Sequence, residues 1–296
     1  MTEAVRIVEV APRDGLQNEK VHVPVAAKIA LVDALSATGV SVIEAASFVS
    51  PRAVPQLADG AEVMAGIARR PGVAYAALVP NMTGYERARA DEVAVFAAAT
   101  ETFSARNINC TVAESLERFR PVLAAAARDG IRVRGYVSCV TDCPYEGSVA
   151  PAAVARLTED LLALGCYEVS LGDTIGRGTP ATVAAMLDAV LDIAPPARLA
   201  GHFHDTGGAA LANVEVSLDR GLRSFDAAAG GLGGVPSRRA RRATWTRWRS
   251  CAGSTSWVTR LAWTRLASKL RPALPARPSA VPLSDRLPRR QIARMI

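Results

Sequence analysis

The sequence predicts an α/β protein of the (β/α)8 barrel class over residues 1–234. Three observations favour this fold. From residue 5 to residue 229, short β-branched runs alternate with Ala- and Leu-rich stretches of helical period. The eight strand-like runs occupy about 230 residues, close to the roughly 250 that are usual for such a barrel. The connections are brief and rich in Gly, Pro and Asp, so they are too short to contain an additional domain.

The predicted strands, taken in chain order, are Val5–Val10, Val40–Ala45, Ala74–Val79, Glu92–Ala97, Arg132–Ser138, Glu168–Leu171, Arg198–His204 and Ser224–Ala228. Helical periodicity predicts helices between them, for example Pro24–Thr38, Glu114–Asp129, Pro151–Leu164, Pro180–Ala194 and Gly208–Arg220. A doubly wound sheet is the alternative. Against it, the first connection after a strand, residues 11–19, lacks the glycine-rich phosphate-binding fingerprint of that fold.

Charge divides the chain at residue 234. The whole chain has a formal charge of +7, which by itself would suggest a nucleic-acid or membrane-surface partner. However, residues 235–296 hold 15 of the 35 basic residues and a single acid, Asp285, so residues 1–234 carry a net −7 and the tail +14. All four tryptophans also lie in the tail. The two parts therefore differ in composition and are interpreted separately.

The compartment signals predict a cytoplasmic protein. No apolar stretch approaches the roughly 18 residues of a membrane span, and the first ten residues lack the layout of a signal peptide. The five cysteines are an odd number without the paired short spacings of a zinc site. We expect reduced, mostly buried thiols, and for Cys139 and Cys143 we favour packing over metal ligation.

Polar residues gather at the predicted carboxyl ends of four strands, where barrels of this class carry their chemistry. They are Arg13, Asp14, Glu44, Ser47, Asp173, Thr174, His202 and His204. The two histidines are two positions apart on one strand, so both side chains point to the same face. With a carboxylate such as Asp14 they form a ligand set that suits Mg²⁺, Mn²⁺, Fe²⁺ or Zn²⁺ and leaves positions open for substrate oxygens.

Each of these features also has a structural interpretation. Arg13-Asp14 after a strand can be a turn, and the His-x-His pair can be two hydrogen-bonded core histidines. Glu44 inside an apolar strand needs a partner, so a site role and a buried ion pair with Arg13 both stay open. Asp173 can act as a helix cap. Their joint occurrence at four strand ends favours a functional site.

At these residues the sequence resembles the 3-hydroxy-3-methylglutaryl-coenzyme A (HMG-CoA) lyases, within a wider superfamily of metal-dependent barrels that includes the isopropylmalate and homocitrate synthases. The matching stretches are residues 8–20 (VEVAPRDGLQNEK), 43–51 (IEAASFVSP), 170–176 (SLGDTIG) and 202–206 (HFHDT). The first two are specific to the lyase branch. The resemblance implies that Asp14, His202 and His204 ligate Mg²⁺ or Mn²⁺.

The implied reaction is a retro-Claisen cleavage of HMG-CoA to acetyl-CoA and acetoacetate. By the resemblance, Arg13 neutralises charge that develops on the substrate carbonyl, and Glu44 and Asp173 line the same pocket as catalytic residues. Asp173 or a histidine is the expected base. Arg13, Ser47 and Thr174 are the expected substrate-binding residues. The expected partner is a small acyl-CoA substrate, with no nucleic acid and no membrane, and a homodimer stays open.

The tail departs from the family at Val235. The lyases carry a proton-donating cysteine in a Gly-Gly-Cys-Pro loop and a metal-binding asparagine a few residues on, whereas this chain has Val235 and Thr244 at those positions. Val235–Thr259 can be back-translated so that the frame one base earlier begins Cys-Pro-Ile-Ala-Pro-Gly-Ala-Ser-Gly-Asn. Three tryptophans, each with a single codon, agree with this reconstruction.

We therefore predict that residues 235–296 record a one-base loss near codon 234, in the gene or in its sequencing. As written, this basic tail would replace the last helix and the lid region of the barrel, would be poorly ordered, and would impair activity. Two other functions stay open: a Claisen-condensing synthase of the isopropylmalate or homocitrate type, and polyanion binding by the tail. The nucleotide sequence across codons 230–260 would test the frame directly.

Overall fold

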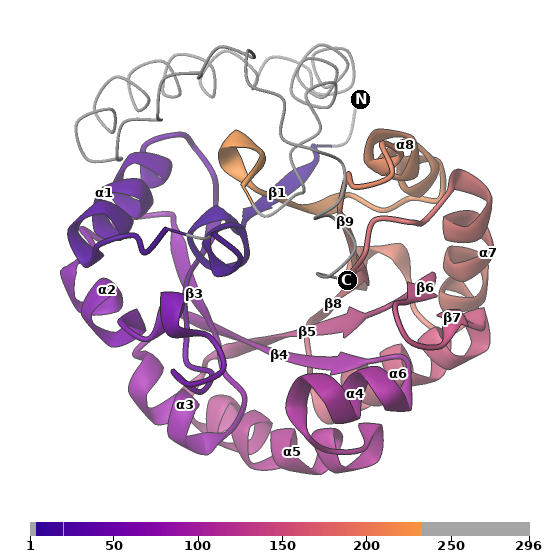
Figure 1. Cartoon of the computed structure of the whole chain (residues 1–296), viewed down its shortest axis with the longest axis horizontal. Coiled ribbons are helices and arrows are strands. Elements are labelled where there is room, and N and C mark those ends of the chain that lie inside the picture. Colours follow the sequence, from indigo (N-terminus) through magenta and orange to yellow (C-terminus); the bar gives the residue numbers. More distant parts are fainter. Residues whose placement is uncertain (1–3, 20, 233–296) are drawn as a thin grey trace, which may run out of the picture.

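The computed structural model describes residues 4–19 and 21–232, and it closes eight parallel strands into a barrel. Figure 1 shows the helices arranged as a ring around these strands. The strands are β1 (Arg6–Glu9), β2 (Val42–Ser47), β3 (Ala74–Leu78), β4 (Glu92–Ala98), β5 (Arg132–Ser138), β8 (Glu168–Asp173), β9 (Leu199–Phe203) and β10 (Ser224–Ala227). Their order around the barrel follows the chain, and β10 closes it by pairing with β1. The predicted (β/α)8 barrel is confirmed.

The outer ring is built from helices that connect successive strands. They are α1 (Val25–Ser36), α2 (Gly60–Gly66), α3 (Met82–Ala88), α4 (Glu101–Ile108), α5 (Val112–Asp129), α6 (Pro151–Leu164), α7 (Pro180–Leu191) and α8 (Ala210–Asp219). Local sequence sets several of their ends. Thr111 and Glu114 form a reciprocal capping box at the start of α5, and Gly130 ends that helix in the left-handed conformation at φ 69°.

Most predicted elements differ from the observed ones by a residue or two at their ends. A short antiparallel hairpin, β6 (Asp142–Cys143) with β7 (Gly147–Ser148), was not predicted and follows β5 at the carboxyl end of the barrel. Two-residue strands lack the length over which alternation can be seen. The predicted tail, residues 235–296, lies outside the described residues.

The barrel is apolar on its outer side and charged inside. Between strands and helices, outward side chains such as Ile43 and Leu171 pack in one buried cluster with Phe119 of α5 and Leu161 of α6. Inside, Arg134 of β5 contacts Asp226 of β10, although these two strands are not neighbours. Such a contact can only cross the interior of the barrel. These interior charges are continuous with the polar groups at the carboxyl ends of the strands, because Asp226 also contacts His202.

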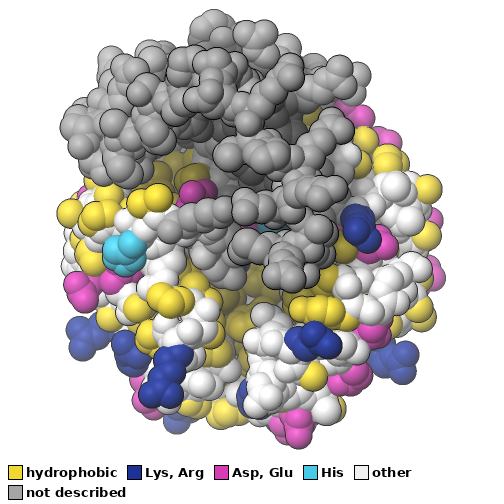
Figure 2. Space-filling view, in the orientation of Figure 1, with side chains coloured by type: hydrophobic (Ala, Val, Ile, Leu, Met, Phe, Trp, Pro, Cys, Tyr) yellow, Lys and Arg dark blue, Asp and Glu magenta, His cyan; other side chains and the backbone are white. Residues whose placement is uncertain are grey.

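The outer surface shows the usual mixture of charges. In the space-filling view, Lys and Arg side chains alternate with Asp and Glu side chains along the rim formed by the helices (Figure 2). Within the part of the chain that the structure describes, no helix has both the length and the apolar character needed to cross a membrane.

Candidate active site

The predicted metal ligands come from the beginning and the end of the barrel sequence, and the fold brings them together. Asp14 lies in a helical turn, Ala11–Gly15, just after β1, while His202 is the next-to-last residue of β9 and His204 comes just after that strand. Because all barrel strands are parallel, these carboxyl ends meet at one face of the barrel. Strands β1 and β9 flank β10, so the three residues converge above that strand.

The donor atoms of these three residues lie within 4.8 Å of one another. The Nε2 atoms of His202 and His204 are 3.0 Å apart, and Asp14 Oδ2 lies 3.8 Å from the first and 3.9 Å from the second. Burial and the neighbouring His202 lower the pKa of His204 to about 4, so its imidazole is neutral at pH 7. Burial acts against the charge of Asp14, but Arg13 and the histidines outweigh it, and the pKa of Asp14 is lowered. Burial acts to lower the pKa of His202, but Asp226 and Asp14 outweigh it and raise that pKa, so a divalent cation would compete with a proton at His202, whereas neutral His204 and ionised Asp14 are in the states that metal binding requires.

Arg13 is held at the edge of this cluster by two carboxylates. Its Nε donates to Glu44 Oε2 at 2.6 Å, and its Nη1 donates to Asp14 Oδ1 at 2.9 Å. Although burial disfavours the charge, Glu44 and Asp14 raise the pKa of Arg13, so the guanidinium stays protonated. Of the two interpretations that the sequence left open for Glu44, the ion pair is therefore present.

Glu44 also offers an unused acceptor. It is 1% exposed, and burial raises its pKa while Arg13 opposes that rise. Its Oε1 is buried and has no hydrogen-bond partner among residues 4–19 and 21–232. A buried carboxylate oxygen without a partner is costly, so it marks a place where a ligand hydroxyl would be accommodated.

The other predicted carboxylate, Asp173, is engaged elsewhere. It ends β8, and its carboxylate accepts hydrogen bonds from the backbone of Arg177 at 3.2 Å and of Gly178 at 2.8 Å, and from Thr141 Oγ1 at 3.2 Å. A Cβ at position 178 would approach Asp173 Oδ2 to 2.8 Å, so glycine is needed there. In the described part of the chain Asp173 makes no hydrogen bond or ion pair with the metal-ligand cluster. Asp173 does not cap a helix, because Thr179 caps α7; its carboxylate instead holds the loop between β8 and α7.

Ser47 and Thr174, predicted to bind substrate, lie at the ends of β2 and β8. Ser47 is buried, and its hydroxyl accepts a long hydrogen bond of 3.4 Å from the backbone of Val49. The Thr174 hydroxyl accepts one of 2.8 Å from the backbone of Cys139, which has a left-handed φ of 61°. Both hydroxyls support loops at the same end of the barrel as the cluster. Their role toward a substrate stays a prediction.

The sequence interpretation missed a buried network beneath the cluster. Asp226 Oδ2 lies 2.9 Å from His202 Nδ1, and Arg134 Nη1 lies 2.7 Å from Asp226 Oδ1. Arg134 also donates to Glu168 at 2.8 Å and to the hydroxyl of Tyr136 at 2.9 Å. A signal was present, because polar residues recur at every second position of the strands, as in Arg132, Arg134 and Tyr136, and Ser224 and Asp226. Period-2 polarity in a central strand of a barrel indicates a polar interior.

The cysteines described by the structure, Cys110, Cys139, Cys143 and Cys166, are free and buried, as predicted. Cys251 lies outside the described residues. Thr100, between β4 and α4, donates a hydrogen bond from its hydroxyl to Cys143 Sγ in β6 at 3.2 Å.

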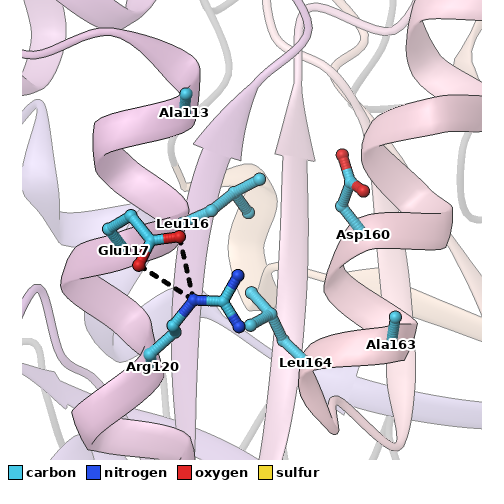
Figure 3. Close-up of a pocket in the computed structure, with 7 residues that line it drawn as sticks. All are labelled: Ala113, Leu116, Glu117, Arg120, Asp160, Ala163 and Leu164. Carbon is cyan, nitrogen blue, oxygen red and sulfur yellow. Dashed lines mark hydrogen bonds and ion pairs between the residues drawn. The ribbon is translucent and has the colours of Figure 1, made fainter.

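A groove on the outside of the barrel has none of these features. It lies between α5 and α6, has a volume of about 220 Å³, and is lined by Ala113, Leu116, Glu117, Arg120, Asp160, Ala163 and Leu164. Figure 3 shows Arg120 turned toward Glu117 within α5, while Asp160 lies across the groove on α6. A cavity well below the several hundred Å³ that are common for ligand sites, whose Arg120 is paired with Glu117, does not compete with the strand ends as a catalytic site.

Glu9 joins the two loops that flank the cluster. Its Oε1 accepts hydrogen bonds from the backbone of Ala11 at 2.9 Å and of Ala229 at 3.0 Å. Ala11 begins the turn that carries Arg13 and Asp14, and Ala229 follows β10. Burial raises the pKa of Glu9 to about 7, while the two backbone donors act to lower it.

We expect Glu9→Gln to remove part of the pH dependence of stability. The raised pKa means that the folded chain keeps a proton which the unfolded chain loses above its ordinary pKa of 4.5. The free energy of unfolding therefore falls as pH rises from about 4.5 to about 7, by an amount on the order of 3 kcal/mol. Glutamine keeps the acceptor oxygen without the charge, so urea unfolding at pH 5 and pH 8 should show the gain at pH 8. Glu117→Gln, at an exposed site, is the matched control; identical pH profiles for wild type and Glu9→Gln would contradict the assignment.

Comparison with known proteins gives consistent results. The HMGL-like family model matches residues 4–244. A curated protein of Pseudomonas aeruginosa, named 3-hydroxy-3-isohexenylglutaryl-CoA/hydroxy-methylglutaryl-CoA lyase, is 58% identical over 239 residues, which are 80% of this chain and 80% of that protein.

Two solved structures extend the similarity to the fold. The HMG-CoA lyase from Brucella melitensis superposes with a TM-score of 0.79 at 57% identity, covering 88% of this chain and 99% of that one. An HMG-CoA lyase from Acinetobacter baumannii, solved in complex with coenzyme A and 3-methylmalate, gives a TM-score of 0.82 at 35% identity and covers 92% and 93% of the two chains.

Proposed function

The chain belongs to the HMGL-like family and is an enzyme, and from this premise we propose that it cleaves HMG-CoA to acetyl-CoA and acetoacetate. The observation that carries the proposal is the cluster of Asp14, His202 and His204 with the Arg13 guanidinium at its edge. An acyl-CoA thioester as substrate is further supported by the relative that was solved with coenzyme A.

The cluster fits a divalent metal ion. Its three donor atoms converge, one imidazole is neutral, and the carboxylate is ionised by its neighbours. Asp14, His202 and His204 would hold the ion, and we propose Mg²⁺ or Mn²⁺, which accept oxygen-rich coordination with open positions. When bound, the ion would lower the pKa of a coordinated hydroxyl and polarise substrate oxygens.

The residues of the chain supply the remaining chemistry. Cleavage converts the tertiary alcohol of the substrate to a ketone, breaks the adjacent carbon–carbon bond and leaves the thioester as an enolate. Arg13, fixed by Glu44 and Asp14, presents its positive charge to the enolate oxygen. We assign acceptance of the hydroxyl proton to Glu44, whose Oε1 is unpaired, and positioning of the loop after β8 to Asp173, whose carboxylate already accepts three hydrogen bonds. Asp173 or a histidine as the base is the alternative that the sequence predicts.

The final step returns a proton to the enolate carbon, and here we propose that the chain is impaired. The family resemblance places a cysteine at position 235, where this chain has valine. The match to the P. aeruginosa lyase covers 80% of this chain and 80% of that protein, so a segment of similar length is unmatched in each. That is the pattern expected when one tail is read in another frame. Residue 235 lies outside the described residues.

The test asks whether the chain cleaves HMG-CoA or condenses acetyl-CoA with 2-oxo acids. Purified full-length chain is incubated with HMG-CoA and Mn²⁺, and acetoacetate and acetyl-CoA are quantified. We expect slow cleavage that stops on addition of EDTA and returns with excess Mn²⁺. Release of free coenzyme A from acetyl-CoA in the presence of 2-oxo acids, without cleavage of HMG-CoA, would instead identify a condensing synthase.

A further inference from the structure

We propose that Asp226 is a positioning residue for the metal site, which holds His202 in the orientation and tautomer that metal binding requires. This inference rests on the proposed function, because that function supplies the metal. It concerns a residue that the sequence did not single out and that contacts His202 at Nδ1, whereas Nε2 is the atom of His202 in the proposed ligand cluster.

The contact between Asp226 and His202 is short and buried. Asp226 Oδ2 lies 2.9 Å from His202 Nδ1, and the side chain of Asp226 is 1% exposed. A carboxylate at this distance accepts the Nδ1 proton. With the proton on Nδ1, the lone pair of Nε2 is directed at the cluster, where His204 Nε2 is 3.0 Å and Asp14 Oδ2 is 3.8 Å away. An acceptor on the far nitrogen thus selects the tautomer that can ligate.

Asp226 is itself fixed by strands on other sides of the barrel. Ser170 of β8 donates to Asp226 Oδ2 at 2.9 Å, and Arg134 of β5 lies 2.7 Å from Oδ1. Arg134 is tied in turn to Glu168 at 2.8 Å. If the carboxylate rotated away from His202, Arg134 would lose its ion pair with Asp226. That loss is costly because Arg134 is only 2% exposed.

The two histidines differ in this respect. Among residues 4–19 and 21–232, His204 contacts His202 and Asp14 but has no acceptor on Nδ1. One ligand is thus anchored by the barrel interior, and the other lies after the end of β9. We infer that His202 fixes the position of the site and that Asp226 is the source of its rigidity.

Asp226→Asn tests the inference on the full-length chain. Asn keeps the shape of Asp but is neutral and has one oxygen, so it cannot both accept from His202 Nδ1 through one oxygen and form an ion pair with Arg134 through the other. We expect the affinity for Mn²⁺, measured from the electron paramagnetic resonance signal of free Mn²⁺, to fall about 10- to 100-fold. The matched control is Glu168→Gln, which removes a charge from the same network without touching His202 and should change the affinity by less than about threefold. Equal losses in both variants, or no loss in Asp226→Asn, would overturn the proposal.

A second measurement uses the wild-type chain and needs no variant to fold. In the metal-free chain labelled with ¹⁵N-histidine, His202 should carry a proton on Nδ1, the nitrogen that faces Asp226. If His202 is not protonated on Nδ1, the proposal fails. Failure of the lyase proposal is separate, since it would appear as Mn²⁺ binding without cleavage. A wild-type chain that binds no Mn²⁺ would overturn the metal site and the role of Asp226 together.

Discussion

Restoring the reading frame after codon 234 should raise the rate of HMG-CoA cleavage about 10²- to 10⁴-fold, which is the range supplied by a positioned proton donor. The restored chain replaces Val235–Thr259 by CPIAPGASGNVDTVALVRGLHELGH and continues in that frame. It places a thiol where the family carries its proton donor and an asparagine in place of Thr244. Acetoacetate formation at saturating HMG-CoA and Mn²⁺ is the measurement.

Two further variants separate the contributions. Val235→Cys in the chain as written supplies the thiol without the rest of the restored segment, and we expect it to recover only part of the rate. In the restored chain, serine in place of the new cysteine should return the rate close to that of the original chain. If the restored chain is no faster than the original, the impairment does not come from this segment.

Arg13→Lys should lower kcat for cleavage about 10²- to 10³-fold, as expected when a preorganised charge facing a developing oxyanion is removed. Arg13 uses Nε for Glu44 and Nη1 for Asp14 and still has N–H groups for the substrate. A lysine ammonium is a single point of charge that cannot reproduce this fork. The effect should appear in kcat more than in KM, because the charge on the enolate oxygen develops during the reaction.

The control for Arg13→Lys is Arg132→Lys, at the amino end of β5 and half exposed, where it pairs with Glu92. It should leave kcat unchanged. Because lysine keeps the positive charge in both variants, a general loss of charge cannot explain a difference between them. A kcat for Arg13→Lys within about threefold of wild type would remove Arg13 from the proposed mechanism.

The sequence identified those site residues whose placement depends on local rules. The alternation of side chains along a strand predicted a shared face for His202 and His204; His202 lies in β9 and His204 directly after its last residue, and their Nε2 atoms are 3.0 Å apart. Asp14 and Arg13 follow β1 directly, so the parallel barrel places them at the same end as the histidines. For these residues, strand identity and fold class were sufficient to predict convergence, and their donor atoms do converge.

The sequence did not identify the partners of residues whose role depends on a contact with another strand or loop. Glu44 had two open interpretations until the distance of 2.6 Å to Arg13 showed the ion pair. Asp173 was grouped with the catalytic residues, yet its carboxylate is bonded to its own loop and to Thr141. Asp226 and Arg134 belong to strands that are not neighbours, so their contact exists only once the barrel has closed.

By itself, the sequence determined the barrel, the strand that carries both histidines, the acidic carboxyl-end site and the change of composition at residue 235. These features follow from periodicities and compositions that extend over a few residues to a few tens of residues. Only the tertiary structure decided which carboxylate pairs with which basic side chain: Glu44 with Arg13, and Asp226 with His202 and Arg134. The physical reason is that electrostatic pairing depends on distance and burial in three dimensions, and a closed barrel brings together side chains from strands that are distant in sequence.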